Sequence, residues 1–560
     1  MSEVHAAPAG PIPTPPDFPV DWADPADQRL FWTQDRMHWP DPVPLLVFDM
    51  LPEYGFNHAF DHYDVPMRFR GTRVNTYLYN AMFPVHLPPE EAEAKHKSSQ
   101  EKMGAAFAGM GELWENEWVP ALQRIHDQLD AMDLRGASNA QLLEYVDGAV
   151  AHLKRLWELH FVIAVPAYLA VSEFDELYRE LFGKEGAYDA YRLVQGLDNL
   201  TLKAGRELWQ LSRKALAVPS IREVLETRAA AEVIPALETT AEGRAFVAEL
   251  RAYLDVFGQR GQTFLTLTDV SWIEDPTPAI KSLKDLVGQP DKDFDAERAA
   301  LAAERDQLLA AARERLKSYP EPVRGQFEFL LKAATIGVVL TEDHNFWIDY
   351  AGTYKVRRVF LEAGRRLAAA GAIPQATDFA HLSLDEIKVT LAALPAVIDQ
   401  KEPVAERKAE MARWAQVQQP PAIGTPPPGP PPADDPFFKF VGKFFGVPPQ
   451  ASADPSELKG AAGSPGKVRA VARVITSLAD AARLAKGEIL VAETTAPPWT
   501  PLFATASAVV TDTGGILSHC AVVAREYGIP AVVGAGRATT TIRDGQLIEV
   551  DGDAGSIKLL

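Results

Sequence analysis

The sequence predicts a multi-domain fold, with a large all-α domain followed by a small α/β domain. Three observations support this. Helical periodicity runs from about residue 27 to 417, a proline-rich stretch follows, and short β-branched runs dominate residues 451–560. At 560 residues the chain is also too long for one compact core, so several domains are expected.

The charge balance and the cysteine count exclude some functional classes. Lys and Arg number 56 and Asp and Glu 76, so the formal net charge is -20. A balance that acidic argues against a nucleic-acid partner, because such binding neutralises phosphates with basic side chains. One cysteine allows neither an internal disulfide nor a cysteine-based zinc site, which favours a reducing compartment.

Residues 1–26 are predicted to form a proline-rich arm without regular structure. They lack a basic segment followed by an apolar core, so no signal peptide is expected. The apolar run "FVIAVPAYLAV" contains Pro166 and is too short to cross a bilayer. We therefore expect a cytoplasmic protein without a membrane partner.

Residues 27–417 are predicted to be an all-α domain. The segment "LAAERDQLLAAARERLKSY" places its leucines along one stripe, as an amphipathic helix does. "SLDEIKVTLAAL" begins with Ser383 and has Glu386 three residues later, which is a capping-box pattern. Strand-like alternation is scarce throughout this region.

Residues 418–450 are predicted to be a hinge. The prolines of "QQPPAIGTPPPGPPPADDP" fix φ and remove backbone donors, so neither helix nor sheet is expected there. Such a segment is semi-extended. A plain tether is the alternative to a hinge that lets the next domain travel.

Residues 451–560 are predicted to fold as α/β. The runs "GEILVAETT", "ASAVVTDT" and "IPAVVGAG" indicate strands, and "GQLIEVDGDAGSIKLL" indicates a terminal hairpin. Between the second and third strands a helix is expected to start near Ile516 and to end at Gly528.

One histidine lies at the mouth of that helix. Gly514 and Gly515 allow a tight turn and a close backbone approach, as in loops that bind phosphate. His519 falls in the first turn, where unpaired N–H groups and the helix dipole favour an anion. A neutral imidazole is a competent nucleophile toward phosphorus, and Ser518 and Arg525 are predicted to support the phosphate. Residue types alone also fit a structural histidine.

The stretch "TGGILSHCAVVAREYGIPAVVG" resembles the phosphohistidine signature of the mobile, swivelling domain of the phosphoenolpyruvate-utilising enzymes. "GAAGSPGKVRAVARVI" and "GEILVAETTAPPWTPLF" resemble earlier parts of that domain, so the likeness covers nearly the last 100 residues. It implies that His519 carries a phosphoryl group. Cys520 stands where many members have a small residue, and packing is the favoured explanation over a redox role.

Two expected parts of such enzymes are missing from the sequence pattern: a glycine-rich, lysine-bearing nucleotide segment and the βα repeats of a phosphoenolpyruvate-binding barrel. The arrangement resembles part of rifampicin phosphotransferase, and resembles more closely the larger subunit of two-component phenol-phosphorylating synthases. The resemblance implies ATP and Mg²⁺ bound mainly by a separate ATP-grasp subunit, with no tightly bound metal in this chain.

The resemblance of the helical region is looser, but it suggests acceptor-site residues. His344 in "EDHNFWID" is the candidate base, with Asp343 or Glu342 orienting it; a structural histidine is the alternative. Further candidates for substrate binding are two cations, one carboxylate and one aromatic residue: Arg260, Arg357, Asp343 and Trp347.

Two further histidine-related positions, 259 and the pair 58 and 62, carry no predicted role. Relatives often have His-Arg where this chain has Gln259 and Arg260, so no base is expected at position 259. His58 and His62 have i, i+4 spacing, but without a third ligand a metal site is not expected.

The leading hypothesis is the acceptor-binding, phosphohistidine-bearing subunit of a dikinase that converts ATP, a phenol and water into an aryl phosphate, AMP and phosphate. The alternatives are an antibiotic-inactivating phosphotransferase of rifampicin phosphotransferase type and a non-catalytic phosphocarrier. The carrier hypothesis leaves the large helical domain unexplained.

Overall fold

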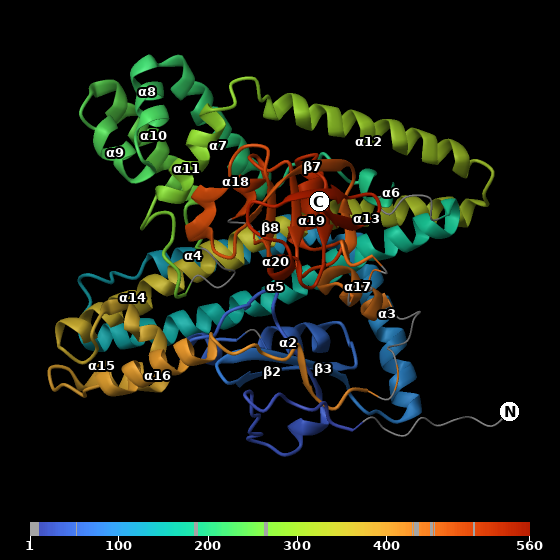
Figure 1. Cartoon of the computed structure of the whole chain (residues 1–560). Helices are drawn as coiled ribbons and strands as arrows, with labels where there is room; N and C mark the ends of the chain where they lie inside the picture. The colour runs from blue at the N-terminus through green and yellow to red at the C-terminus, as the bar shows by residue number, and fades with distance from the viewer. Residues whose placement is uncertain are drawn as a thin grey trace. The chain divides into compact units, whose positions relative to one another are not determined.

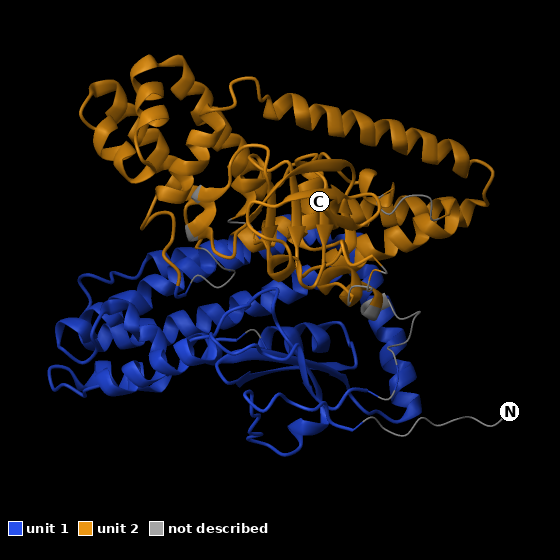
Figure 2. Ribbon diagram, in the orientation of Figure 1, with its two compact units in different colours: residues 1–166, 265–268, 347–435 blue, residues 167–264, 269–346, 436–560 orange. Residues whose placement is uncertain are grey.

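The computed structural model describes residues 10–51, 53–183, 189–261, 267–427, 429, 436–447, 452, 454–496 and 499–560. The chain forms two compact units (Figure 2). The first comprises residues 1–166, 265–268 and 347–435, and the second residues 167–264, 269–346 and 436–560. The second unit thus joins helices from the middle of the chain to the C-terminal domain.

The first unit contains an antiparallel sheet with strand order β2-β3-β1-β4. The strands are β1 Phe31–Gln34, β2 Met67–Val74, β3 Tyr77–Pro84 and β4 Ala422–Gly424. Here the all-α prediction for residues 27–417 was wrong. The alternation of "MRFRGTRVNTYLYNAMFP" forms a hairpin that turns at Asn75 and Thr76, whose φ values are 48° and 70°.

The proline-rich hinge also differs from its prediction. Its residues 422–424 form β4, an edge strand on which Gly424 pairs with Phe31. Farther along, residues 436–445 form the helix α17. Residues 428, 430–435 and 448–450 of the predicted hinge lie outside the described part of the chain.

The predicted N-terminal arm has neither helix nor strand over residues 10–26, and most of its side chains there are exposed, but Phe18 anchors it. Phe18 is fully buried, and its ring lies 5.6 Å from that of Trp414, so this part of the arm belongs to the core of the first unit. The free energy of burying one aromatic ring, about 2–3 kcal/mol, offsets part of the entropy lost by an extended segment.

Helices form the rest of the first unit. They are α1 Leu45–Asp49, α2 Glu53–His62, α3 Pro89–Leu113, α4 Val119–Asp130, the first part of α5 Asn139–Phe182, α14 Thr353–Ala369, α15 Leu384–Ala393 and α16 Lys401–Trp414. The capping box of Ser383 and Glu386 at the start of α15 is confirmed. The helix α5 is apolar and long enough to cross a membrane, but 78% of its most apolar stretch is buried within the protein.

The helices of the second unit are the second part of α5, α6 Asp189–Arg192, α7 Leu200–Ala217, α8 Pro219–Thr227, α9 Ala230–Leu237, α10 Ala241–Phe257, α11 Thr277–Val287, α12 Phe294–Leu316, α13 Glu321–Asn345 and α17 Pro436–Phe445. Among them, α7 to α11 share a hydrophobic core and lie together in Figure 1, in green. The predicted amphipathic helix is α12, although only Phe294, Ala312 and Leu316 along it are buried.

The C-terminal domain, red in Figure 1, is built on an eight-stranded sheet with order β5-β12-β11-β7-β8-β9-β10-β6. Its strands are β5 Glu457–Lys459, β6 Ala461–Ser464, β7 Lys467–Val474, β8 Ile489–Ala492, β9 Ala508–Thr511, β10 Ala531–Val533, β11 Leu547–Asp551 and β12 Ser556–Leu559. β7 to β10 are parallel neighbours. The three predicted strands and the terminal hairpin of β11 and β12 are confirmed.

Three short helices complete this domain: α18 Thr500–Phe503, α19 His519–Glu526 and α20 Ala538–Thr541. The helix predicted to start near Ile516 begins at His519, because Ser518 is extended, with φ -65° and ψ 155°. Gly528 follows the helix with φ 63°, as a C-terminal glycine does.

Candidate phosphohistidine site

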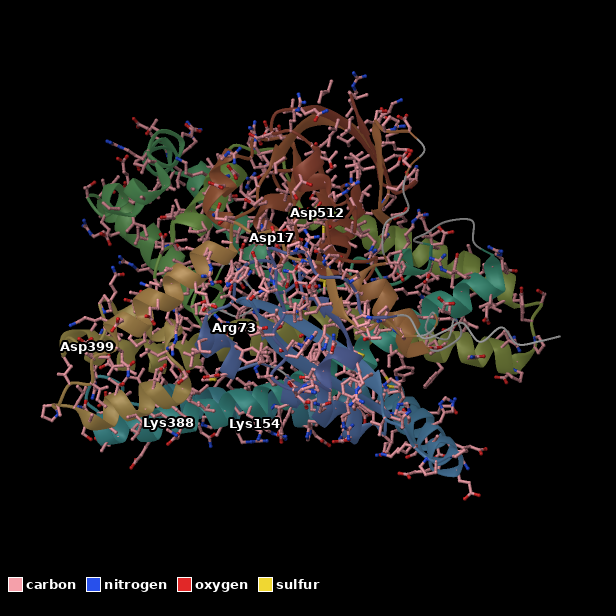
Figure 3. All side chains as sticks on the ribbon, turned by 60° about the horizontal axis from the view of Figure 1, so that its bottom comes forward. Asp17, Arg73, Lys154, Lys388, Asp399 and Asp512 are labelled. Carbon is pink, nitrogen blue, oxygen red and sulfur yellow. The ribbon has the colours of Figure 1, made fainter. Side chains whose placement is uncertain are left out.

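His519 is the first residue of α19, as predicted for a residue of the first turn. The loop before it leaves β9 at Asp512, which is labelled in Figure 3 and accepts a hydrogen bond from Thr539 N at 3.1 Å. Gly514 has φ 93°, a conformation that favours glycine and closes the turn. The hydrogen bond at Asp512 and the turn at Gly514 thus fix the course of the loop, and His519 is 8% exposed.

Both ring nitrogens of His519 have partners within the second unit. Nδ1 lies 3.2 Å from Oε1 of Glu342 on α13, and Nε2 lies 3.3 Å from the Thr500 hydroxyl. Because a carboxylate accepts hydrogen bonds, the contact assigns the proton to Nδ1 and the lone pair to Nε2. Nε2 is then the nitrogen that can attack phosphorus.

The sequence did not assign this role to Glu342, which it offered only as a residue that might orient His344. The Glu342 side chain is buried, and its Oε2 has no hydrogen-bond partner among the described residues. Burying a carboxylate costs free energy unless it is paired or hydrogen-bonded. Among the described residues, the side chain of Glu342 has His519, 177 positions later in the sequence, as its hydrogen-bond partner.

Of the predicted phosphate-supporting residues, Gly514, Gly515 and Ser518 lie in the loop before His519, and Arg525 lies on α19. Ser518 Oγ is buried without a hydrogen-bond partner among the described residues, so it is placed to donate to an added group. The Arg525 guanidinium donates to the carbonyls of Gly463 and Ile516, at 2.9 and 3.1 Å, and so stiffens the loop. Gly515 N donates to a carbonyl of α17. The roles of Gly514, Gly515, Ser518 and Arg525 toward phosphate stay predictions.

Cys520 is buried among apolar neighbours, as the packing explanation expects. Burial raises the pKa of its thiol to about 12, although hydrogen bonds with Thr495 and Thr511 act in the opposite direction. A thiol with so high a pKa is a poor nucleophile at neutral pH.

The two residues after Glu342 are engaged by the protein itself. Asp343 accepts a hydrogen bond from Leu200 N at 2.7 Å, at the start of α7. His344 is 1% exposed, and its Nδ1 donates to the carbonyl of Leu340 at 2.6 Å. The hydrogen bond places the proton on Nδ1 of His344, so a base role would fall to its Nε2.

Asp343 makes the stability of the second unit depend on pH. Burial, with the charge of Glu342 as a smaller cause, raises its pKa from 3.8 to about 7. The folded protein therefore binds a proton that the unfolded chain has lost between these values. Stability falls as pH rises through this window, by up to about 1.4 kcal/mol per pH unit. Asp343→Asn should remove this slope between pH 4 and 7, as measured by urea unfolding.

Asp198→Asn serves as the control, because the Asp198 side chain is 88% exposed. This variant should keep the slope of the wild type. Equal slopes for the wild type and Asp343→Asn would contradict the assignment.

The remaining candidates fall in different units. Arg260, in the second unit, is 3% exposed, donates to the Phe257 carbonyl at 2.7 Å and lies over the ring of Trp272. It lines a cavity together with Lys292 and Thr500, the residue that contacts His519 Nε2. Arg260 is thus the predicted cation that the structure brings into the surroundings of His519.

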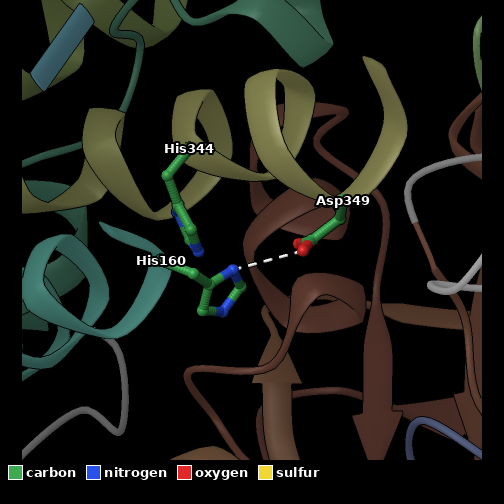
Figure 4. A group of neighbouring side chains, drawn as sticks. All are labelled: His160, His344 and Asp349. Carbon is green, nitrogen blue, oxygen red and sulfur yellow. Dashed lines mark ion pairs between the residues drawn. The ribbon is translucent and has the colours of Figure 1, made fainter. Parts of the chain in front are cut away.

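Arg357 and Trp347 belong to the first unit. Arg357 is 1% exposed and donates to the Leu267 carbonyl at 2.9 Å, and the Trp347 carbonyl accepts from His126 at 2.9 Å. In the same unit His160 lies 3.2 Å from Asp349, an ion pair that Figure 4 draws. These residues have structural partners, and their predicted substrate contacts stay predictions.

Sequence comparison supports the resemblance drawn from the motif. Residues 484–555 match the mobile domain of PEP-utilising enzymes, and residues 160–342 match the fourth domain of rifampicin phosphotransferase. The first match contains His519 and the second ends at Glu342. The resemblance to the phosphoenolpyruvate-utilising enzymes is confirmed for these two segments.

Relatives extend the likeness to nearly the whole chain. It is 40% identical, over 98% of its length, to the chondramide synthase cmdD of Chondromyces crocatus, 14% of which is covered. It is 28% identical, over 95% of its length, to the uncharacterized phosphotransferase YvkC of Bacillus subtilis (strain 168), 62% of which is covered. A rifampicin phosphotransferase of a Streptomyces species is 31% identical over 68% of the chain, with 42% covered.

The chain therefore carries the mobile domain of the phosphoenolpyruvate-utilising enzymes and is related to phosphotransferases. It spans between 14% and 62% of the length of these three relatives.

Proposed function

We propose that the chain is the phosphoryl-carrying and acceptor-binding part of a phosphotransferase. His519 receives the β-phosphoryl group of ATP, with release of AMP and phosphate, and passes it to a hydroxyl group of an organic acceptor. The observation that carries this proposal is the contact of His519 with Glu342 at 3.2 Å. It joins the predicted phosphoryl carrier, through its Nδ1, to the end of the helical segment that matches a domain of rifampicin phosphotransferase.

The contact also fits the chemistry of the transfer. Phosphoryl transfer requires an in-line acceptor and positive charge or hydrogen bonds near the moving group more than covalent catalysis. With the proton held on Nδ1 by Glu342, His519 leaves as a neutral imidazole when the N–P bond breaks. Ser518, whose hydroxyl is buried and unpartnered among the described residues, is a donor for the phosphoryl oxygens.

ATP and Mg²⁺ would be held mainly by an ATP-grasp domain, which is distinct from the two segments, 160–342 and 484–555, that match known domains. We propose that this domain is a separate protein and that the complex works in the cytoplasm. Magnesium would supply positive charge that offsets the negative charge of the phosphates during transfer.

For the acceptor, the relatives support a rifampicin phosphotransferase type of reaction more than the phosphorylation of a simple phenol. Three relatives carry the name rifampicin phosphotransferase, and part of the helical region matches a domain of that enzyme. We therefore propose a hydroxyl on a larger organic compound as the acceptor. A small phenol remains the second candidate, and the match of the helical region speaks against a carrier that lacks an acceptor site.

The proposal is tested by mixing the chain with an ATP-grasp domain, ATP and Mg²⁺ and adding a panel of acceptors. The panel holds ansamycin antibiotics and simple phenols, and AMP and the phosphorylated product are measured by chromatography. We expect AMP formation that depends on both the chain and an acceptor. Product formation with ADP in place of AMP would contradict the dikinase reaction, and AMP formation by the chain alone would place the nucleotide site within it.

A further inference from the structure

The helix α17 ends against the loop that carries His519. The last four carbonyls of any α-helix lack partners within the helix. In α17 two of them are satisfied by the loop: Leu517 N donates to the Lys443 carbonyl and Gly515 N to the Phe444 carbonyl, both at 2.8 Å. The backbone of the histidine loop is thus hydrogen-bonded to the C-terminus of α17.

Glycines make this approach possible. A Cβ on Gly515 would lie 2.2 Å from the Lys443 carbonyl oxygen, far inside van der Waals contact. Gly446, with φ 89°, packs in the same way, because its Cβ would lie 2.8 Å from the Gly514 carbonyl oxygen. The sequence suggested that Gly514 and Gly515 bind phosphate; in the structure their backbone packs against the C-terminus of α17.

The lysines of α17 face the acidic side of α5. Lys443 Nζ lies 2.8 Å from Asp175 and 2.7 Å from Glu176, and Lys439 Nζ lies 3.3 Å from Glu176. Tyr168 packs between the helices, with its ring 4.7 Å from that of Phe444. Both α5 residues 167–182 and α17 belong to the second unit.

The two contacts of α17 differ in strength. The contact with the loop consists of two backbone hydrogen bonds, from Gly515 and Leu517 to carbonyls of α17, and salt does not screen these neutral bonds. The contact with α5 combines packing of the Tyr168 ring on Phe440 and Phe444 with ion pairs. The pair of Lys439 and Glu176, whose side chains are each 32% exposed, is the part that water and salt weaken. Asp175 also keeps Arg179, at 2.8 Å, as a partner when Lys443 leaves.

We propose that α17 is part of the mobile body and forms its electrostatic docking surface on α5. The body that swings then begins at or before residue 436, not at residue 451. When it leaves the acceptor site, the Lys–carboxylate contacts with α5 break, while the hydrogen bonds to the histidine loop remain. This inference rests on the proposed function in one respect, namely that the domain must travel to be loaded.

A distance measurement tests the docking surface without any phosphoryl transfer. Spin labels are attached to Val447→Cys, which is 68% exposed, and to Glu180→Cys on α5, while the buried Cys520 is left unlabelled. We expect a single short distance for the otherwise unchanged chain. Lys439→Glu or Glu176→Lys should raise the population at longer distances about fivefold. In the double charge swap Lys443 still faces the new lysine, so we expect the open population to fall below that of Glu176→Lys without reaching the wild type. A double swap as open as Glu176→Lys alone would overturn the docking surface.

Hydrogen exchange tests which contact breaks. The amides of Gly515 and Leu517 should stay protected to the same extent in both single variants and in the double swap, because α17 moves with the loop. Loss of that protection in the single variants would show that α17 stays on α5, and would overturn the proposal. Both readouts are obtained without ATP or acceptor, so a failure of the proposed function leaves their outcome unchanged.

Discussion

Replacing His519 by asparagine should abolish both phosphorylation of the chain and transfer to the acceptor, with a fall in rate of about 10⁴-fold or more. Asparagine keeps a polar side chain of similar reach in the first turn of α19 but offers no nucleophilic nitrogen. The Nε2 atom beside Thr500 is the one ring nitrogen that the structure leaves with a lone pair for phosphorus. The measurement uses ATP labelled in its β-phosphate and follows label on the chain and on the acceptor.

The matched control is His96→Asn, at an exposed position of α3. This variant should incorporate label as the wild type does. Product formation by His519→Asn at more than a hundredth of the wild-type rate would mean that the phosphoryl group reaches the acceptor by another route.

Removing the Glu342 carboxylate should slow the unloading of His519 without slowing its loading. Glu342 lies on α13, so it can act on His519 only while the C-terminal domain is docked on these helices. Without the carboxylate the imidazole loses the partner that holds its proton on Nδ1, and transfer should fall by about 10²-fold in Glu342→Ala. Glu342→Gln keeps an acceptor for Nδ1–H and should recover part of the loss.

The experiment separates the two half-reactions. Loading is followed with the ATP-grasp domain in the absence of acceptor, and unloading with the isolated phosphorylated chain. Glu328→Ala is the control for loss of a carboxylate from the same helix, because the Glu328 side chain is 47% exposed, and its unloading rate should stay close to that of the wild type. Equal slowing of loading and unloading in Glu342→Ala would point to a general loss of structure and would contradict the positioning role.

Local sequence signals were sufficient to predict the strands and the helix start near His519. The strands β8, β9 and β10 follow from short β-branched runs bounded by turn residues, and the position of His519 follows from the glycines before it. The capping box at Ser383 was likewise local. These features depend on neighbours within a few positions, which is what sequence periodicity reports.

Features that depend on distant contacts could not be obtained in this way. β4 is a strand only because Phe31 and its neighbours offer an edge to a proline-flanked segment nearly 400 positions later. Glu342 becomes a partner of His519 only through tertiary packing. The β2–β3 hairpin is different: its alternation and Asn75 were visible signals that the prevailing helical pattern concealed.

The central claim is that one nitrogen of His519 carries the phosphoryl group from ATP to the acceptor. A single-turnover chase tests it most directly. The chain is phosphorylated, separated from ATP and the ATP-grasp domain, and mixed with acceptor, and phosphate on His519 is mapped by mass spectrometry. The account predicts phosphate on Nε2 of His519 that disappears as phosphorylated acceptor appears in equal amount. Phosphate that stays on the chain, with product forming only when ATP is added back, would contradict it.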